Sequence, residues 1–171
     1  MSDVSRRGFL RVGSLAAAGA AVATAGARPA AAQSTLATTL PYLRTKVGNV
    51  RQLQVGVPVP FTFPDAASPC VLVKLGAAAL GGIGPDGDVV AYSTLCPHKG
   101  GPLAYNAAER MMACPLHFST FDPAKDGMMI IGQATERLPR IDLSLDDATG
   151  DVFAVGVLGL IYGRAANVIK V

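Results

Sequence analysis

The 171-residue sequence has only three cysteines, two histidines, no tryptophan and 16% charged residues. Three cysteines are too few for a scaffold held together by disulfides. Because half of the residues are hydrophobic, the chain is too apolar and too weakly charged to be intrinsically disordered. The 19 glycines and 12 prolines follow no three-residue period, which excludes collagen and favours one turn-rich, mostly β domain.

The net charge of +3 comes entirely from the N-terminal part of the chain. Residues 1–32 contain four of the 15 basic residues and one of the 12 acidic residues, so the rest of the chain holds 11 of each. A domain without net charge offers no electrostatic reason to bind nucleic acid or an anionic membrane surface.

Residues 1–32 are similar to an export signal. Paired Arg6 and Arg7, followed by Gly-Phe-Leu, precede an uncharged stretch at 12–27, and small residues allow cleavage after Ala32 or after Ala27. The paired arginines resemble the twin-arginine motif, which predicts export to the periplasm. The alternative is a retained membrane anchor. We disfavour it because a helix of that length spans about 24 Å, whereas a bilayer core is about 30 Å thick.

From residue 33 onward the sequence predicts an all-β domain, an antiparallel sandwich or barrel. Short runs rich in Val, Ile and Leu are separated by turn sequences that contain Gly, Pro and Asp. These runs are Val50–Val55, Pro69–Leu75, Asp88–Thr94, Met128–Ile131, Ile141–Leu145 and Asp151–Val157. Ala104–Arg110 is the segment with a helical tendency, enough for one turn.

Both histidines lie close to a cysteine. Cys96 and His98 form a Cys-Pro-His sequence, and Cys114 and His117 form Cys-Pro-Leu-His, with 15 residues between His98 and Cys114. Two thiolates and two imidazoles can bind one tetrahedral zinc ion or one [2Fe–2S] cluster. The Cys-x-His spacing is shorter than the ligand pairs of zinc fingers, so we expect the cluster.

The sequences around these pairs, CPHKG and CPLHFS, resemble the two cluster-binding loops of Rieske [2Fe–2S] proteins. The resemblance implies a Rieske-type fold, a β sandwich or barrel with a small cluster-binding subdomain. It places the domain at 33–171 and the cluster-binding loops at about 94–139. Residues 132–139 are similar to the third loop, which covers the cluster in that family.

The same resemblance assigns roles to individual residues. It implies that Cys96 and Cys114 bind the inner iron, and that His98 and His117 bind the outer iron and serve as the electron port. Ser119 matches a serine that forms a hydrogen bond to the cluster in high-potential members.

The matching tyrosine of those members is Phe121 in this sequence, so we expect an intermediate potential. Rieske centres span roughly −150 to +300 mV. We also expect the potential to fall with pH in the alkaline range, because reduction then takes up a proton on a ligand imidazole.

The sequence departs from the family at two positions. Gly101 and Leu116 stand where many Rieske proteins have cysteines that form a disulfide between the loops. Cys70 has no free partner if Cys96 and Cys114 bind iron, so the loops lack a disulfide. We expect the loops to be more mobile or supported by a partner subunit. Cys70 lies in an apolar run and is predicted to be a buried, inert thiol.

Residues 39–169 also resemble the small subunit of bacterial arsenite oxidase, notably at Phe61–Asp65, Gly132–Glu136 and Gly159–Arg164. This implies an electron-transfer subunit without catalytic residues of its own. Its partners would be a large molybdopterin subunit, which holds the arsenite site, and a periplasmic cytochrome c or cupredoxin. Residues 39–53 and 162–171 are candidates for contact with the large subunit, and Lys99 is a candidate for orienting a partner.

Four alternatives remain. The chain could be the Rieske subunit of a related periplasmic molybdoenzyme such as iodate reductase, in which electrons flow inward. A bc1-type or b6f-type Rieske protein would have a membrane span and usually the disulfide. A dioxygenase ferredoxin would be cytoplasmic and have no signal. A zinc protein without redox activity is the alternative of a different class.

Overall fold

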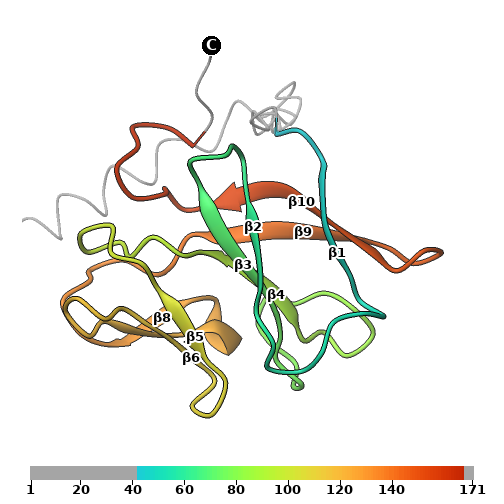
Figure 1. The fold of residues 1–171 in the computed structure, drawn as a ribbon, viewed down its shortest axis with the longest axis horizontal. Coiled ribbons are helices and arrows are strands. Elements are labelled where there is room, and N and C mark those ends of the chain that lie inside the picture. Colours follow the sequence, from blue (N-terminus) through green and yellow to red (C-terminus); the bar gives the residue numbers. More distant parts are fainter. Residues whose placement is uncertain (1–41, 168–171) are drawn as a thin grey trace, which may run out of the picture. The chain divides into compact units, whose positions relative to one another are not determined.

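Ten short strands and one 3-10 turn form the part of the chain that the computed structural model describes, residues 42–167 (Figure 1). The predicted signal at 1–32 lies outside these residues, as does part of each predicted partner contact, 39–53 and 162–171. In the described residues, no helix has the length and apolar character needed to cross a membrane.

The strands form two sheets. The larger has six strands in the order β1-β10-β9-β4-β3-β2. Its strands are β1 (Thr45–Asn49), β2 (Val59–Thr62), β3 (Pro69–Lys74), β4 (Val89–Ser93), β9 (Arg140–Asp146) and β10 (Asp151–Leu158). All pairings between these named strands are antiparallel. The expected all-β antiparallel fold is therefore confirmed.

The smaller sheet has four antiparallel strands in the order β5-β6-β7-β8. Its elements are β5 (Ala104–Asn106), β6 (Met111–Ala113), β7 (Thr120–Asp122), the 3-10 turn η1 (Pro123–Lys125) and β8 (Met128–Ile131). This sheet is inserted between β4 and β9, the place predicted for the cluster-binding subdomain.

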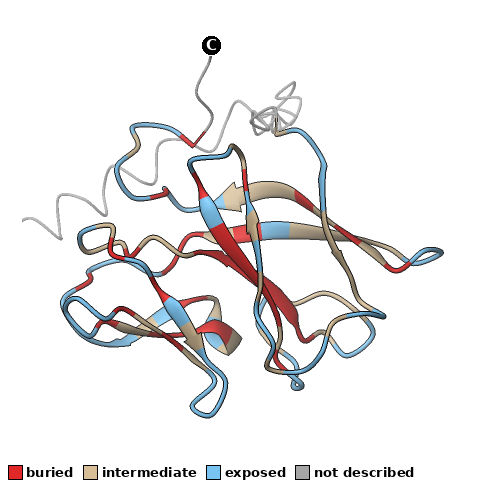
Figure 2. Cartoon of the chain, viewed as in Figure 1, coloured by how far each residue is buried: buried red, intermediate tan, exposed pale blue. Residues whose placement is uncertain are grey.

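Strands β3 and β4 are buried on both faces, as Figure 2 shows in red. One face contributes to a core with Met112, Phe121 and Leu138 of the inserted subdomain. The other face packs with Ile141 and Val152 of the large sheet. Burial on both faces explains why these strands are nearly continuous apolar runs instead of alternating ones. The shared core also fixes the subdomain against the large sheet.

The predicted strand Val50–Val55 is wrong. Strand β1 ends at Asn49, and the chain turns there, with the Gln52 N–H donating to the Asn49 carbonyl (3.0 Å). The side-chain oxygen of Asn49 accepts from the Arg51 N–H (3.0 Å). Such side-chain bonds offer the backbone an alternative to sheet pairing. The alternation at 50–55 therefore falls mainly on a turn.

The predicted helical turn at Ala104–Arg110 is also wrong. Its first three residues are β5, and the rest is the turn of a hairpin to β6. The side-chain oxygen of Asn106 accepts from the N–H groups of Ala108 (3.0 Å) and Glu109 (3.3 Å). Arg110 then adopts a left-handed conformation (φ 55°), which ends any helix and brings the chain back.

Strand β2 was not predicted because it contains Pro60, which has no N–H for a sheet. The structure places β2 at the edge of the large sheet, where a proline is tolerated. The other five predicted strands are confirmed to within about one residue at each end.

Candidate metal centre

The four predicted ligands lie on two tight loops of the inserted subdomain. The first loop follows β4 and carries Cys96 and His98. The Cys96 N–H donates to the Gly101 carbonyl (2.8 Å), and the Gly100 N–H donates to the Cys96 carbonyl (2.7 Å). These two bonds close the loop around His98.

The second loop joins β6 to β7 and carries Cys114 and His117. The Cys114 N–H donates to the Ser119 carbonyl (2.9 Å), and the Phe118 N–H donates to the Cys114 carbonyl (3.0 Å). Phe118 has a left-handed backbone (φ 60°), which reverses the chain. Each loop therefore holds its cysteine at the base of a hydrogen-bonded reversal.

The structure brings the four residues into one place. Cys96 and Cys114 are 1% and 2% exposed, and their side chains lie within interaction distance of each other. The imidazole rings of His98 and His117 are 4.8 Å apart between centroids and meet edge to face at 82°. His98 is half-buried and His117 is exposed. The sulfur atoms are thus inside, and the imidazoles lie towards the surface.

Burial raises the pKa of the Cys96 thiol, and the neighbouring Cys114 side chain raises it further. Hydrogen bonds from the backbone N–H groups of His98 and Lys99 act in the opposite direction. Two buried thiolates side by side repel each other, so the ionised pair needs a cation between or beside them. The N–H groups and a metal ion would meet that need together.

The donor set fits a two-iron cluster. His98 Nδ1 is buried and has no hydrogen-bond partner among the described residues, a costly state for a polar atom unless it binds something. A Rieske-type cluster takes two protein ligands at each iron, and the paired cysteines and paired histidines of this chain supply that number.

Leu116 fills the place of the missing disulfide. A Cβ built on Gly101 would lie 2.7 Å from Leu116 Cδ1 and 3.0 Å from Cys114 Sγ, so the loops touch directly at this point. All three cysteines of the chain are free, as expected. Packing of Leu116 over a residue without a side chain therefore joins the two loops at the positions where the resemblance to Rieske proteins implies a disulfide.

Ser119 has a structural task that the sequence did not reveal. It is fully buried, and its hydroxyl oxygen accepts from the N–H groups of Gln133 (3.0 Å) and Ala134 (3.2 Å). A Cβ on Gly132 would lie 2.3 Å from Ser119 Cα, so the third loop passes very close to the second. Both bonds use the oxygen as acceptor, so the hydroxyl hydrogen is available for the predicted bond to a cluster.

The remaining candidate residues lie away from the sulfur pair or on the surface. Cys70 is 2% exposed, and burial raises its pKa to about 12, as expected for an inert thiol. Phe121 is fully buried in the core shared by the two sheets. Lys99 is exposed, which permits the predicted contact with a partner but does not test it.

The chain is similar to known proteins over most of its length. A family model described as the Rieske [2Fe-2S] domain matches residues 44–142. Iodate reductase subunit IdrB of Denitromonas iodatirespirans is 44% identical over 168 residues, which cover 96% of this chain and 86% of that protein. The subunit of the same name from Pseudomonas sp. (strain SCT) is 42% identical, with coverages of 94% and 82%.

Solved structures agree on the fold. The soluble domain of the Rieske protein II (soxF) from Sulfolobus acidocaldarius superposes with a TM-score of 0.63 over 73% of this chain and 83% of that one, at 24% identity. The plasma membrane Rieske protein PetC3 from Synechocystis PCC 6803 gives a TM-score of 0.51 at 19% identity, over 64% of this chain and 97% of that one.

Proposed function

Because the chain belongs to the Rieske [2Fe–2S] domain family, we propose that it is the electron-transfer subunit of a periplasmic molybdoenzyme of the iodate reductase kind. The observation that carries the electron-transfer role is the buried Cys96–Cys114 pair beside the His98–His117 pair. The large subunit would hold the molybdopterin and the substrate site.

Two substrates compete within this proposal. The sequence alone favoured arsenite oxidase, with electrons flowing outward. Identities of 44% and 42% over nearly the whole chain to iodate reductase subunits favour the alternative, with electrons flowing inward from a cytochrome c or cupredoxin. The ligand residues of this chain serve either direction equally, so the partner subunit sets the direction.

In this proposal, Cys96, Cys114, His98 and His117 hold the cluster. A bound Rieske cluster would accept and release one electron at a time, at a higher potential than the [2Fe–2S] cluster of plant-type ferredoxins, which has four cysteine ligands. The two imidazoles contribute by remaining neutral where thiolates would add negative charge. Exposed His117 is the ligand nearest to solvent, and we assign the electron port to it together with His98.

The residues around the ligands exclude water from the thiols and hold the third loop in place. The buried thiols lie in a core closed to water, and Ser119 ties the third loop over the second. A hydrogen bond from its free hydroxyl hydrogen to a sulfur would stabilise the reduced state and raise the potential.

The test is to co-express the chain with its large subunit and purify the complex from periplasm. We expect iron and molybdenum in the complex, and an EPR signal on dithionite reduction with an average g value below that of the free electron. Iodate should support oxidation of a reduced dye, whereas arsenite should not reduce an oxidised one. Zinc without iron would overturn the proposal, and arsenite-dependent activity alone would return the assignment to arsenite oxidase.

The matched variants are His117→Ala and Glu109→Ala. The first should abolish the EPR signal and electron delivery, while the large subunit keeps its activity with an artificial donor. The second changes an exposed residue of the β5–β6 turn and should behave like the wild type.

We also propose export by the twin-arginine route, on the basis of Arg6 and Arg7. Replacing both with lysine should leave the iron-loaded chain in the cytoplasmic fraction. Unchanged periplasmic recovery would exclude this route.

A further inference from the structure

A segment at the C-terminal side of β10, residues 159–167, lies against the first metal-binding loop. We call it the strap. A Cβ built on Gly100 would lie 2.6 Å from Cδ1 and 2.8 Å from Cε1 of Tyr162, so the tyrosine ring rests on the backbone of Gly100. A pocket of about 430 Å³ is lined by the strap together with Pro97 of the first loop and Glu136 of the third.

The strap is a closed loop held by one side chain. The Ile161 N–H donates to Asn167 Oδ1 (2.9 Å), and Asn167 Nδ2 donates to the Gly159 carbonyl (2.7 Å). Asn167 is 5% exposed and Ile161 is fully buried. Tyr162 therefore follows the fully buried Ile161, in a loop whose two ends are joined by the Asn167 side chain.

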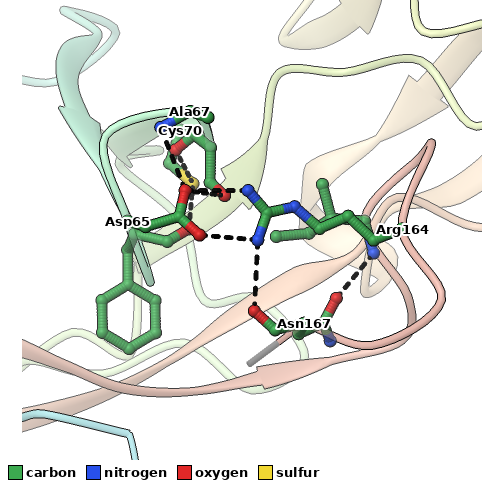
Figure 3. A network of polar contacts seen from close by, with 8 residues as sticks. Asp65, Ala67, Cys70, Arg164 and Asn167 are labelled. Atoms are coloured by element: carbon green, nitrogen blue, oxygen red, sulfur yellow. Dashed lines mark hydrogen bonds and ion pairs between the residues drawn. The ribbon is translucent and has the colours of Figure 1, made fainter. Parts of the chain in front are cut away.

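An ion pair fastens the strap to the large sheet (Figure 3). Arg164 donates from both terminal nitrogens to both oxygens of Asp65, at 2.7 and 2.8 Å, and also to the Asn167 carbonyl (3.2 Å). Asp65 lies in the connection between β2 and β3. Two-point guanidinium–carboxylate pairs fix orientation as well as distance. The position of the Tyr162 ring is therefore set by the large sheet.

We propose that the strap is a clamp for the first metal-binding loop, with Tyr162 as a positioning residue and Asp65–Arg164 as its anchor. It supports from outside a loop that has no disulfide. The proposal rests on the proposed function, because it assumes that Cys96 and His98 bind the cluster.

The Tyr162 ring contacts the residue whose hydrogen bond closes the first loop. Gly100 is the residue whose N–H closes the reversal onto the Cys96 carbonyl, with His98 between them. The ring blocks outward movement of Gly100. If the ring is removed, this hydrogen bond opens more often, and the two ligands on the loop lose their fixed separation.

The experiment compares Tyr162→Ala, Tyr162→Phe and Arg164→Gln in the full chain with its large subunit. Three quantities are measured: amide hydrogen exchange of the peptide that spans the first loop, the midpoint potential, and the rate at which the visible absorption bleaches. Leu80→Ala, which truncates an exposed leucine in the β3–β4 connection, is the control for loss of apolar surface.

We expect Tyr162→Ala to speed amide hydrogen exchange of the first loop about tenfold and to shift the midpoint potential and the EPR spectrum. The visible absorption of this variant should bleach several times faster. Tyr162→Phe keeps the ring and should match the wild type. Arg164→Gln should change all three quantities in the same direction but less. Combining it with Tyr162→Ala should add little, since both variants act through one clamp.

Wild-type exchange in Tyr162→Ala would overturn the proposal. Faster exchange with an unchanged potential and EPR spectrum would overturn the positioning role. If Tyr162→Ala does not fold, Tyr162→Leu replaces it under the same criteria. If the protein contains no iron, the proposed function fails, and hydrogen exchange of the first loop alone then decides whether the clamp exists.

Discussion

The two candidate metal-binding loops are supported in different ways. The second loop is supported from within the subdomain, where buried Ser119 accepts two hydrogen bonds from the third loop. The first loop is supported from outside, by the Tyr162 ring on a strap that an ion pair fastens to the large sheet. The comparison indicates two different substitutes for a disulfide: a buried hydroxyl for the second loop and a clamp at the surface for the first.

The largest effect should come from crowding the support of the second loop. In Gly132→Ala, the new Cβ would lie 2.3 Å from Ser119 Cα at a backbone φ of 124°, and backbone cannot move aside cheaply. We expect a loss of about 3 kcal/mol in unfolding free energy and most of the bound iron. Urea unfolding and iron analysis measure both.

Gly87→Ala is the matched control for that variant. Gly87 also has a positive φ (61°), but nothing lies within 4 Å of its Cβ position. The unfolding free energy of Gly87→Ala should fall only by the roughly 1–2 kcal/mol that a left-handed backbone costs an alanine. The variant should keep its iron. Equal losses in the two variants would mean that the contact with Ser119 is not a support.

A smaller effect should follow from Ser119→Ala. The change leaves the N–H groups of Gln133 and Ala134 without their partner, which should cost about 1–3 kcal/mol. The potential should also fall, because the predicted hydrogen bond to the cluster is lost. Thr120→Ala removes a hydroxyl with one exposed bond to the Phe118 carbonyl and should change neither quantity by a comparable amount.

The anchor of the first loop should depend on pH. The Arg164 guanidinium lowers the pKa of Asp65 from its usual 3.8 to about 2. Because the folded state has the lower pKa, this stabilisation is complete above about pH 4 and is lost as pH falls from 4 through 2. Because solvent screens this half-exposed pair, we expect the ion pair to contribute about 1 kcal/mol to the unfolding free energy.

The measurement is hydrogen exchange of the strap as a function of pH. In Asp65→Asn the strap should exchange faster already at neutral pH and show a weaker acid transition. Asp147→Asn, in the β9–β10 turn, is the control and should keep the wild-type profile. A wild-type profile in Asp65→Asn would show that the ion pair does not anchor the strap.

The smallest effect concerns Cys70, which lies beside the anchor (Figure 3). Its sulfur is 3.4 Å from the carbonyls of Phe63 and Ser68, and burial raises its pKa to about 12. We expect no labelling of Cys70 by a maleimide at pH 7.5 in the folded protein and full labelling after unfolding. Cys70→Ala should keep its iron. Labelling in the folded state would show that the anchor region opens.

The sequence indicated the candidate site better than its supports. The Cys–His pairs are local, so two short motifs were enough to select Cys96, His98, Cys114 and His117 as candidates, and the structure brings these four residues together. Strands buried on both faces were found as apolar runs, whereas β2 was missed because Pro60 is tolerated only at an edge that sequence does not locate. Short β6 and β7 have three residues each, too few to show a period.

The clamp could not be predicted because its parts are distant in the chain. Asp65 and Arg164 are 99 residues apart. Both belong to segments that carry the resemblance to arsenite oxidase small subunits, Phe61–Asp65 and Gly159–Arg164, yet nothing in either segment says that they touch. The same holds for Tyr162, whose ring rests on Gly100, a contact that no local pattern indicates. Its predicted contact with a partner subunit stays a prediction.

The ion pair also closes a long ring of chain. Asp65 precedes both candidate loops and Arg164 follows them, so their contact encloses every candidate ligand in one ring. The entropy cost of closing a ring grows only slowly with its length, so such distant segments can be joined at little extra cost over a shorter ring. Opening this one contact would therefore free both ends of the ring at once.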